Sequence, residues 1–431
     1  MPKTSGERLA VHGGTPVRSE PLLPGYPGGL LIGDAEKAAV MEVLDSQSLF
    51  RHYGPRPMHK VTQLERAFAK AMGAGHAVGV TSGTAALMTS LAALGVGPGD
   101  EVIVPTYTWV ATINAVIHLG AVPVFVDIDE TLTMDPTKVE AAVTPETKAV
   151  LPVHMRGAGT DMGPILDIAR RRNLRIVEDA AQALGGRYRG RRLGTLGDVG
   201  AFSLQYHKVI TTGEGGMVVT DSPRLWERAV RYHDQGSIRM EELDETIPVG
   251  NELMIGINFR MSEITGAIGL VQLERMEWII GQMRAHKAAM IDGLRGIDGL
   301  TIRPLPDPDG DTGATLMFYL PTAESARVFS RALNAEGVRV GVAWDSGQHV
   351  YYHFDQIIER RMFSERHCSW ECPRYKGRAR LEKGMFPQSD DLLQRVLLLE
   401  LNPLFTERDE SDIVRATRKV AACCTRRVFR S

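Results

Sequence analysis

Short apolar segments that alternate with helical stretches constrain the fold of this chain most strongly. Between residues 77 and 220 the apolar runs have strand length, and the stretches between them, such as 165–172, have the periodicity of amphipathic helices. Strands are predicted at 77–80, 101–105, 121–127, 149–154, 175–179, 199–204 and 217–220. Runs that stay apolar throughout are typical of parallel strands covered on both faces. The sequence therefore predicts an α/β fold with a mostly parallel central sheet and helices on both sides.

The chain has 431 residues, which is too long for a single small domain, and two domains are expected. A further amphipathic helix is predicted at 262–284, and the segments 299–304 and 315–321 that follow it are predicted to be strands of a smaller domain. We place the boundary near residue 280, so that residues 1–280 form a large domain and residues 281–431 a smaller α+β domain. The Pro- and Gly-rich segment 1–30 is expected to be extended and, like the basic last residues, poorly ordered.

The charge balance argues against two classes of partner. Lys and Arg number 50, Asp and Glu number 52, and no basic stripe is visible, so neither nucleic acid nor an anionic membrane is an expected partner. The chain start lacks the apolar core of a signal peptide, and nowhere do roughly 18 uncharged apolar residues run together. We therefore expect a cytoplasmic protein without a membrane span, in which the four late cysteines form no disulfide framework.

Asp179 and Lys208 point to specific chemistry. Asp179 ends an apolar strand and is followed by small residues, and a buried carboxylate is costly unless it is paired. Lys208 lies in a turn ahead of a glycine-rich run at 213–216. A lysine amine, a buried carboxylate and a phosphate loop are what pyridoxal phosphate (PLP) requires, as imine anchor, counter-ion of the pyridine nitrogen and phosphate cradle. The alternatives are a helix-capping Asp179 and a solvated Lys208.

Three further positions fit a PLP site. The run Thr81–Ser82–Gly83–Thr84–Ala85–Ala86 follows a predicted strand and opens a helix, so its N–H groups would face an anion, although an ordinary N-cap has the same pattern. Trp109 lies just past a strand end and could stack on the pyridine ring or simply pack in the core. Gln182, one helical step after Asp179, could hydrogen-bond the phenolic oxygen of the cofactor.

Together these residues identify a family. The chain closely resembles the DegT/DnrJ/EryC1/StrS aminotransferases, the sugar and aminocyclitol branch of fold type I PLP enzymes. The matching segments are GGTPV (13–17), SGTAAL (82–87), GDEVIVP (99–105), EDAAQ (178–182), GEGG (213–216) and NFRMSE (258–263). They span roughly residues 10 to 280, and as a set they are specific for the family.

The resemblance implies a role for each matching residue. Phosphate binding is implied for Thr84, Ala85 and Ser203, ring stacking for Trp109, pairing with the pyridine nitrogen for Asp179, a hydrogen bond to the phenolic oxygen for Gln182, and the internal aldimine for Lys208. It also implies a homodimer in which Asn258 reaches the phosphate of the partner's site. The implied reaction moves an amino group from glutamate or glutamine to a keto group on a sugar or cyclitol, as in secondary-metabolite biosynthesis.

Some positions depart from the commonest family pattern. Many sugar aminotransferases have Val-His-Leu-Tyr-Gly where this chain has VHMRG at 153–157, and Arg156 could bind a carboxylate or phosphate bidentately. His154 in that turn and His207 beside the lysine are further candidates for substrate contact. The neighbours of Lys208 resemble those of the cyclitol- and aminobenzoate-forming members. Dehydratase members usually replace this lysine by His, so Lys208 favours transfer over a lyase or dehydratase reaction, and over a non-catalytic regulator.

Residues 344–385 are less familiar and are predicted to form an atypical insertion. Two histidines at 349 and 353 and two cysteines at 368 and 372 could make a tetrahedral metal site. The three-residue gap between the cysteines is unusual for zinc, and no second CxxC is present. We therefore expect no metal, and an insertion that covers the substrate.

Overall fold

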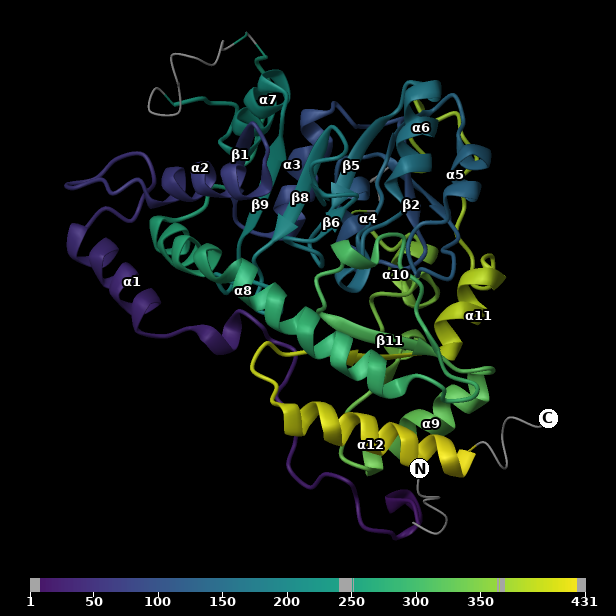
Figure 1. Ribbon diagram of the computed structural model, residues 1–431. Coiled ribbons are helices and arrows are strands. Elements are labelled where there is room, and N and C mark those ends of the chain that lie inside the picture. Colours follow the sequence, from purple (N-terminus) through teal and green to yellow (C-terminus); the bar gives the residue numbers. More distant parts are fainter. Residues whose placement is uncertain (1–7, 240–249, 251, 363, 365–368, 425–431) are drawn as a thin grey trace.

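The computed structural model describes residues 8–239, 250, 252–362, 364 and 369–424 (Figure 1). A seven-stranded sheet has the order β1-β9-β8-β5-β4-β2-β3. Its strands are β1 (His76–Val80), β2 (Glu101–Pro105), β3 (Val122–Val126), β4 (Thr147–Val150), β5 (Arg175–Asp179), β8 (Val199–Ser203) and β9 (Gly216–Thr220). Only β9 among them is antiparallel to its neighbours; the other pairings are parallel. The predicted α/β class and mostly parallel sheet are confirmed.

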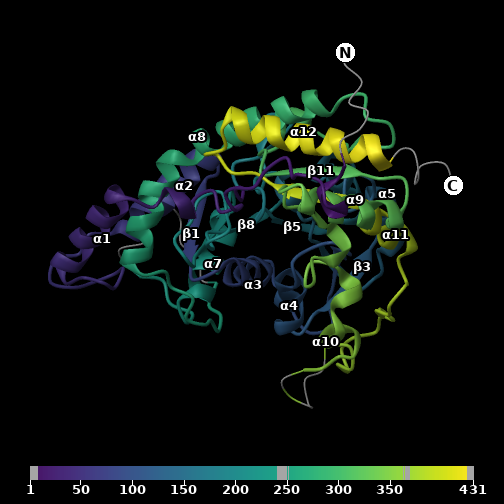
Figure 2. The ribbon, with the colours of Figure 1, turned by 90° about the horizontal axis from the view of Figure 1, so that it is seen from below.

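Helices cover both faces of this sheet. Figure 2 shows α3 (Gly83–Ala93), α4 (Val110–His118) and α7 (Pro223–His233) together on one side. The opposite face is covered by α2 (Lys60–Met72), α5 (Pro136–Ala142), α6 (Met162–Arg172) and the start of α8 (Glu263–Leu294).

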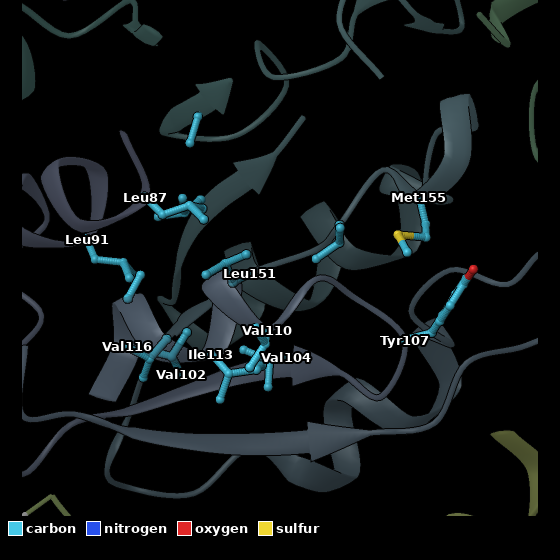
Figure 3. Close-up of a cluster of buried hydrophobic side chains, with 14 of the residues drawn as sticks. Leu87, Leu91, Val102, Val104, Tyr107, Val110, Ile113, Val116, Leu151 and Met155 are labelled. Carbon is cyan, nitrogen blue, oxygen red and sulfur yellow. The ribbon is translucent and has the colours of Figure 1, made fainter. Parts of the chain in front are cut away.

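Strand β2 shows why the sequence folds this way. Val102 and Val104 pack with Leu91 of α3 and Ile113 of α4 in the cluster of Figure 3. Ile103 points to the other face and packs among residues of α5 and α6. Because successive side chains of a strand alternate between faces, a run that is apolar throughout can be buried on both sides.

A second sheet follows in the C-terminal part. Its strands β10 (Thr301–Ile302), β11 (Thr315–Tyr319), β12 (Gly341–Val342) and β13 (Val396–Glu400) are all antiparallel, in the order β10-β11-β13-β12. Further helices of the chain are α1 (Asp34–Ser46), α9 (Ala323–Ala335), α10 (Asp355–Ile358), α11 (Pro387–Arg395) and α12 (Glu407–Cys424). Helices α9 and α12 bury their apolar residues against this sheet. A short hairpin is formed by β6 (Arg187–Tyr188) and β7 (Arg191–Arg192).

Helix α8 joins the two sheets without a break. Met276 and Ile279 pack in a cluster of the large sheet, whereas Met290 and Leu294 pack in the core of the C-terminal sheet. The boundary expected near residue 280 therefore falls inside a continuous helix. The apolar spacing carries on from one core to the next, so no turn signal marks the change.

The N-terminal segment also differs from its expectation. Leu9 is buried in the core of the C-terminal sheet, and the N–H groups of Ala10 and Val17 donate to the carboxylate of Glu336 at 2.8 and 3.0 Å. Residues 9–24 thus contact the C-terminal part, whereas the Gly28 N–H donates to the Lys208 carbonyl beside the large sheet. These contacts differ from the poor order expected for the segment, and those of residues 9–24 differ from their assignment to the large domain. Residues 1–7 and 425–431 lie outside the described residues.

The predicted insertion packs against the large sheet. The N–H groups of Thr108 and Val110 donate to the carbonyl groups of His349 and Gln348, at 3.0 and 2.9 Å. Tyr351 is fully buried in the cluster that α3 and α4 share. The first part of the insertion is therefore fixed at the loop that follows β2.

Candidate active site

A cavity of about 1020 Å³ opens where the parallel strands end. Its walls come from the segments that follow β1, β2, β4, β5 and β8, from residues 22–27, and from the end of β13. Asp179 is the last residue of β5 and Ser203 the last of β8. Carboxyl ends of parallel strands meet at one sheet edge, so side chains distant in sequence converge there.

The start of α3 forms the anion loop. Ser82 caps the helix: its Oγ accepts from the Ala85 N–H at 3.0 Å and its carbonyl from the Ala86 N–H at 2.9 Å. Gly83 and Thr84 both line the cavity, and Ser82 does not accept a hydrogen bond from the N–H group of either residue. A Cβ on Gly83 would lie 2.7 Å from the Ser203 Cβ, so only glycine permits this close approach. Ala85 is buried and its N–H donates to the Ser82 Oγ, so its predicted phosphate contact stays a prediction.

Asp179 is buried, with 4% of its surface exposed. Its Oδ2 accepts from the Thr112 hydroxyl at 2.8 Å and its Oδ1 from the Ala181 N–H at 3.0 Å. Burial raises the pKa of this carboxyl above its ordinary value, although both hydrogen bonds act to lower it. The hydrogen bond from the Ala181 N–H is of the kind expected for a helix-capping Asp179. A buried carboxylate whose hydrogen-bond donors are all neutral nevertheless favours a cationic partner.

Lys208 faces the same cavity from a hydrogen-bonded turn. Its N–H donates to the Gln205 carbonyl at 2.9 Å, and its carbonyl accepts from the Gly28 N–H at 3.4 Å. Burial lowers the pKa of the Lys208 amine, an effect that the charge of Asp179 opposes and that of Arg156 assists. A lowered pKa increases the fraction of neutral, nucleophilic amine.

Trp109 and His349 form an aromatic pair in the cavity. Trp109 is 46% exposed, and its ring centroid lies 4.8 Å from that of His349. The Nδ1 of His349 lies 3.1 Å from the Ser346 carbonyl and must donate to it, which leaves Nε2 as an acceptor. Burial lowers the pKa of His349 to about 3, and the charges of Arg156 and Lys208 add to this, so the imidazole is neutral.

Comparison with known proteins identifies the family of the chain. The DegT/DnrJ/EryC1/StrS aminotransferase family matches residues 31–365. The chain belongs to this family. An L-glutamine:2-deoxy-scyllo-inosose aminotransferase from Micromonospora echinospora is 37% identical over 433 residues, covering 96% of this chain and 98% of that relative. The predicted family and enzyme class are confirmed.

Solved structures agree with this assignment. The structure of 3-amino-5-hydroxybenzoic acid synthase matches with a TM-score of 0.77 and 28% identity, over 94% of this chain and 100% of that one. NtdA from Bacillus subtilis, solved with bound cofactor PMP, matches with a TM-score of 0.75 and 25% identity, over 94% of this chain and 86% of that one. PMP is the aminated form of PLP, so the match is consistent with PLP as the cofactor of this family.

His154 has a structural place in the aminotransferase. It is fully buried, its Nδ1 accepts from the Thr160 N–H at 3.1 Å, and its Nε2 donates to Glu178 at 2.8 Å. The Glu178 carboxylate also accepts from the N–H groups of Gly194, Leu196 and Gly197. Both ring nitrogens of His154 are used, which corrects its predicted substrate contact; it holds the backbone beside Asp179, whose carbonyl accepts from the His154 N–H at 3.0 Å.

Arg156 and His207 both line the cavity, Arg156 in its wall and His207 at an exposed position. Arg156 has a left-handed backbone with φ of 57°. Its Nη1 lies 3.3 Å from Glu400 Oε1, and its Nε donates to the Tyr107 hydroxyl at 3.4 Å. The His207 ring packs edge-on against Tyr26, with 4.5 Å between centroids. Gln182, Thr84 and Ser203 also line the cavity.

Asn258 lies apart from this cavity. It is exposed, and its Oδ1 accepts from the Arg260 N–H at 3.2 Å. Asn258 is absent from the residues that line the cavity of the described chain.

Several residues of the site were missed from sequence. Thr112 lies one helical turn after Trp109, a spacing that could have indicated it. His349 was considered only as a member of a metal set that the sequence did not favour. Glu400 and Tyr26 reach the cavity only through the packing of the C-terminal sheet and the N-terminal segment.

In the described part of the chain, no three His, Cys, Asp or Glu side chains lie close enough together to hold an ion. His353 Nε2 lies 3.1 Å from the Trp344 carbonyl, and Cys372 is buried. Cys368 lies outside the described residues. No helix among those described is both long and apolar enough to cross a membrane.

Proposed function

We propose that this aminotransferase uses PLP to move the amino group of glutamine or glutamate to a keto group on a cyclitol or sugar. The observation that carries the proposal is the buried Asp179 carboxylate, held by neutral donors and facing a lysine of lowered pKa. A protonated pyridine nitrogen would place a positive charge beside this carboxylate. Glycine at 83, where a Cβ would clash with Ser203, leaves room for a phosphate at the helix N-terminus.

Each part of the cofactor has a matching group on this chain. The N–H groups of Gly83 and Thr84 and the hydroxyl of Ser203 would hold the phosphate. The exposed face of Trp109 would stack on the ring, and Gln182 would donate to the phenolic oxygen. When bound, PLP holds the substrate nitrogen covalently and draws in the electron pair of the broken Cα–H bond.

Lys208 would perform the proton transfer. Its neutral amine removes the hydrogen from Cα of the donor and later delivers a hydrogen to the carbonyl carbon of the acceptor. The two half-reactions balance. The donor loses its amino group and its Cα hydrogen and gains a keto oxygen from water. The acceptor gains an amino group and a hydrogen on its carbonyl carbon, and its oxygen leaves as water. Asp179 keeps its negative charge throughout and stabilises the positive ring nitrogen.

The acceptor is proposed to be a polyol ketone. His349 offers a neutral nitrogen acceptor in the cavity, which suits a substrate hydroxyl. The relative named for 2-deoxy-scyllo-inosose, which spans nearly all of this chain, supports a keto cyclitol over a nucleotide sugar.

The test supplies each amino acid in turn to the PLP-loaded protein and follows the absorption of the cofactor. We expect glutamine or glutamate to convert it to the PMP form, and a keto cyclitol to restore it with formation of the amino cyclitol. Lys208→Ala should abolish both conversions. Release of ammonia or carbon dioxide without PMP would contradict the proposal and favour a lyase.

The site is further proposed to be shared between two chains. Helix α1 projects from the body of the molecule (Figures 1 and 2), and large apolar side chains are exposed on it and on segments near Asn258. They are Met41, Leu44, Leu49, Tyr53, Leu253, Ile255 and Ile257. Such exposure supports a self-association surface, from which Asn258 would reach the phosphate in a second copy.

Mixing inactive subunits tests the shared site. In a mixed dimer of Lys208→Ala and Asn258→Ala chains, one site combines native Lys208 with native Asn258, so activity at limiting PLP should exceed that of either parent. Confirmed subunit exchange without a gain would show that the phosphate contact is made within one chain.

A further inference from the structure

Arg156 places a positive charge in the wall of the cavity. The roles proposed above for the cofactor-binding residues do not account for this charge. Its side chain is only 13% exposed, so the guanidinium is largely removed from water. The left-handed conformation of Arg156, followed by Gly157 at φ of 87°, turns this side chain into the cavity. A cation removed from water needs an anion beside it, both in the empty cavity and when a substrate is bound.

Glu400 is the anion that this chain provides, and the pair is weak by its geometry. The single contact of 3.3 Å joins one guanidinium nitrogen to one carboxylate oxygen. Glu400 is 46% exposed, and ion pairs with a hydrated partner contribute little. A planar guanidinium binds a carboxylate best through two parallel hydrogen bonds, which Glu400 does not offer here.

A transaminase must take two unlike substrates in one site. The amino acid donor has a carboxylate on the carbon that reacts, whereas a polyol ketone is neutral. Arg156 and Lys208 line the same cavity, so a substrate held at Lys208 has the guanidinium within the same site. Arg339 also lines the cavity, but it is exposed and hydrated, so it is the weaker candidate.

We infer that Arg156 exchanges partners during the reaction cycle: it binds the carboxylate of the donor bidentately, and returns to Glu400 when the neutral acceptor is bound. The inference rests on the proposed transamination and names the residues that let one cavity accept both substrate classes. Glu400 thus acts as a built-in competitor for the donor, and Arg156 as the residue that selects it.

Calorimetry on the PLP-loaded protein with glutarate, a dicarboxylate that has no amino group to react, tests this exchange. Arg156→Met should weaken glutarate binding by at least about tenfold, the value of a charge-assisted hydrogen bond. Glu400→Gln should tighten it by about two- to sixfold, since an exposed pair competes by no more than that. Both variants should leave binding of neutral myo-inositol within about twofold.

A double variant and a remote control separate exchange from general charge effects. In the Arg156→Met background, Glu400→Gln should no longer tighten glutarate, because the competition acts through Arg156. Glu140→Gln removes a carboxylate of similar exposure, 41%, that pairs with Arg171 and Arg172 away from the cavity, and it should leave glutarate binding unchanged. Arg156→Lys keeps the charge and replaces Arg156→Met if that variant does not fold; it should still lose the bidentate geometry and weaken glutarate severalfold.

The outcomes separate this inference from the proposed function. Two results would refute the exchange and leave transamination standing, provided that glutamine reacts with the wild type. One is unchanged affinity of the Arg156 variants for glutarate and glutamine. The other is that Glu400→Gln still increases the affinity for glutarate in the Arg156→Met background. If no amino acid produces PMP in the wild type, the proposed function fails whatever glutarate does.

Discussion

Thr112→Val should slow the donor half-reaction through its effect on Asp179, which Thr112 contacts in the wall of the cavity. The Thr112 hydroxyl donates to Asp179 Oδ2 at 2.8 Å, and both residues are buried. Valine has almost the same shape but no hydroxyl, so the substitution removes one hydrogen bond to the carboxylate without opening a cavity. The neighbouring Thr108 hydroxyl loses a 2.6 Å contact but remains 3.4 Å from the Trp109 carbonyl, which can accept from it.

The size of the effect follows from the strength of that bond. A hydrogen bond to a charged group is worth roughly 1.5–3 kcal/mol. Loss of this hydrogen bond should raise the pKa of Asp179 further, beyond the increase that burial already causes. A carboxyl that is easier to protonate holds the ring nitrogen less firmly, and the full loss would slow the step by about ten- to a hundredfold.

Rapid mixing of each PLP-loaded variant with saturating glutamine measures this step through the change in cofactor absorption. Thr112→Ser is the matched control, because it keeps the hydroxyl and loses only a methyl group, at a cost of about 1 kcal/mol in folding stability. The serine variant should react at close to the wild-type rate. Equal rates for Thr112→Val and Thr112→Ser would refute the view that this hydroxyl supports the charge of Asp179.

Three further results are expected. Asp179→Asn should retain bound PLP but lose most of the donor half-reaction rate, and near-normal turnover would place the counter-ion elsewhere. Gly83→Ala should weaken PLP binding in a titration, because its Cβ would lie 2.7 Å from the Ser203 Cβ; unchanged affinity would mean that the loop yields. Burial lowers the pKa of His233 to about 3, so its contribution to stability is present above pH 6.5 and is lost as the pH falls toward 3. Urea unfolding measures how far the free energy of unfolding falls between pH 7 and pH 5. This decrease should be about 2 kcal/mol smaller for His233→Gln than for the wild type, and equal decreases would exclude His233 as the cause.

The large sheet could be predicted because its strands are apolar on both faces. Strands β2 and β5 begin and end where the sequence indicated, at 101–105 and 175–179. The boundary near residue 280 could not be found, since the apolar spacing of α8 continues from one core into the next. Burial of Leu9 and the bonds to Glu336 depend on contacts across more than three hundred residues, which no local pattern reports.

The site was predictable where function depends on residues within one loop or at a strand end. Asp179, Lys208 and Trp109 all line the cavity as expected. His154 could not be separated from a substrate ligand by sequence, because only its hydrogen bonds to Thr160 and Glu178 show that both ring nitrogens are occupied.

The partners of Asp179 explain why its position tolerates a buried charge before any cofactor arrives. Backbone and hydroxyl donors supply two hydrogen bonds that orient the carboxylate, and both of these donors are neutral. His154 also holds the end of β5 in place, because its Nε2 donates to Glu178 and its backbone N–H donates to the Asp179 carbonyl. The chain thus bears part of the desolvation cost of Asp179 in the free protein. A cationic ring nitrogen would recover that cost on binding, so cofactor and fold should stabilise one another.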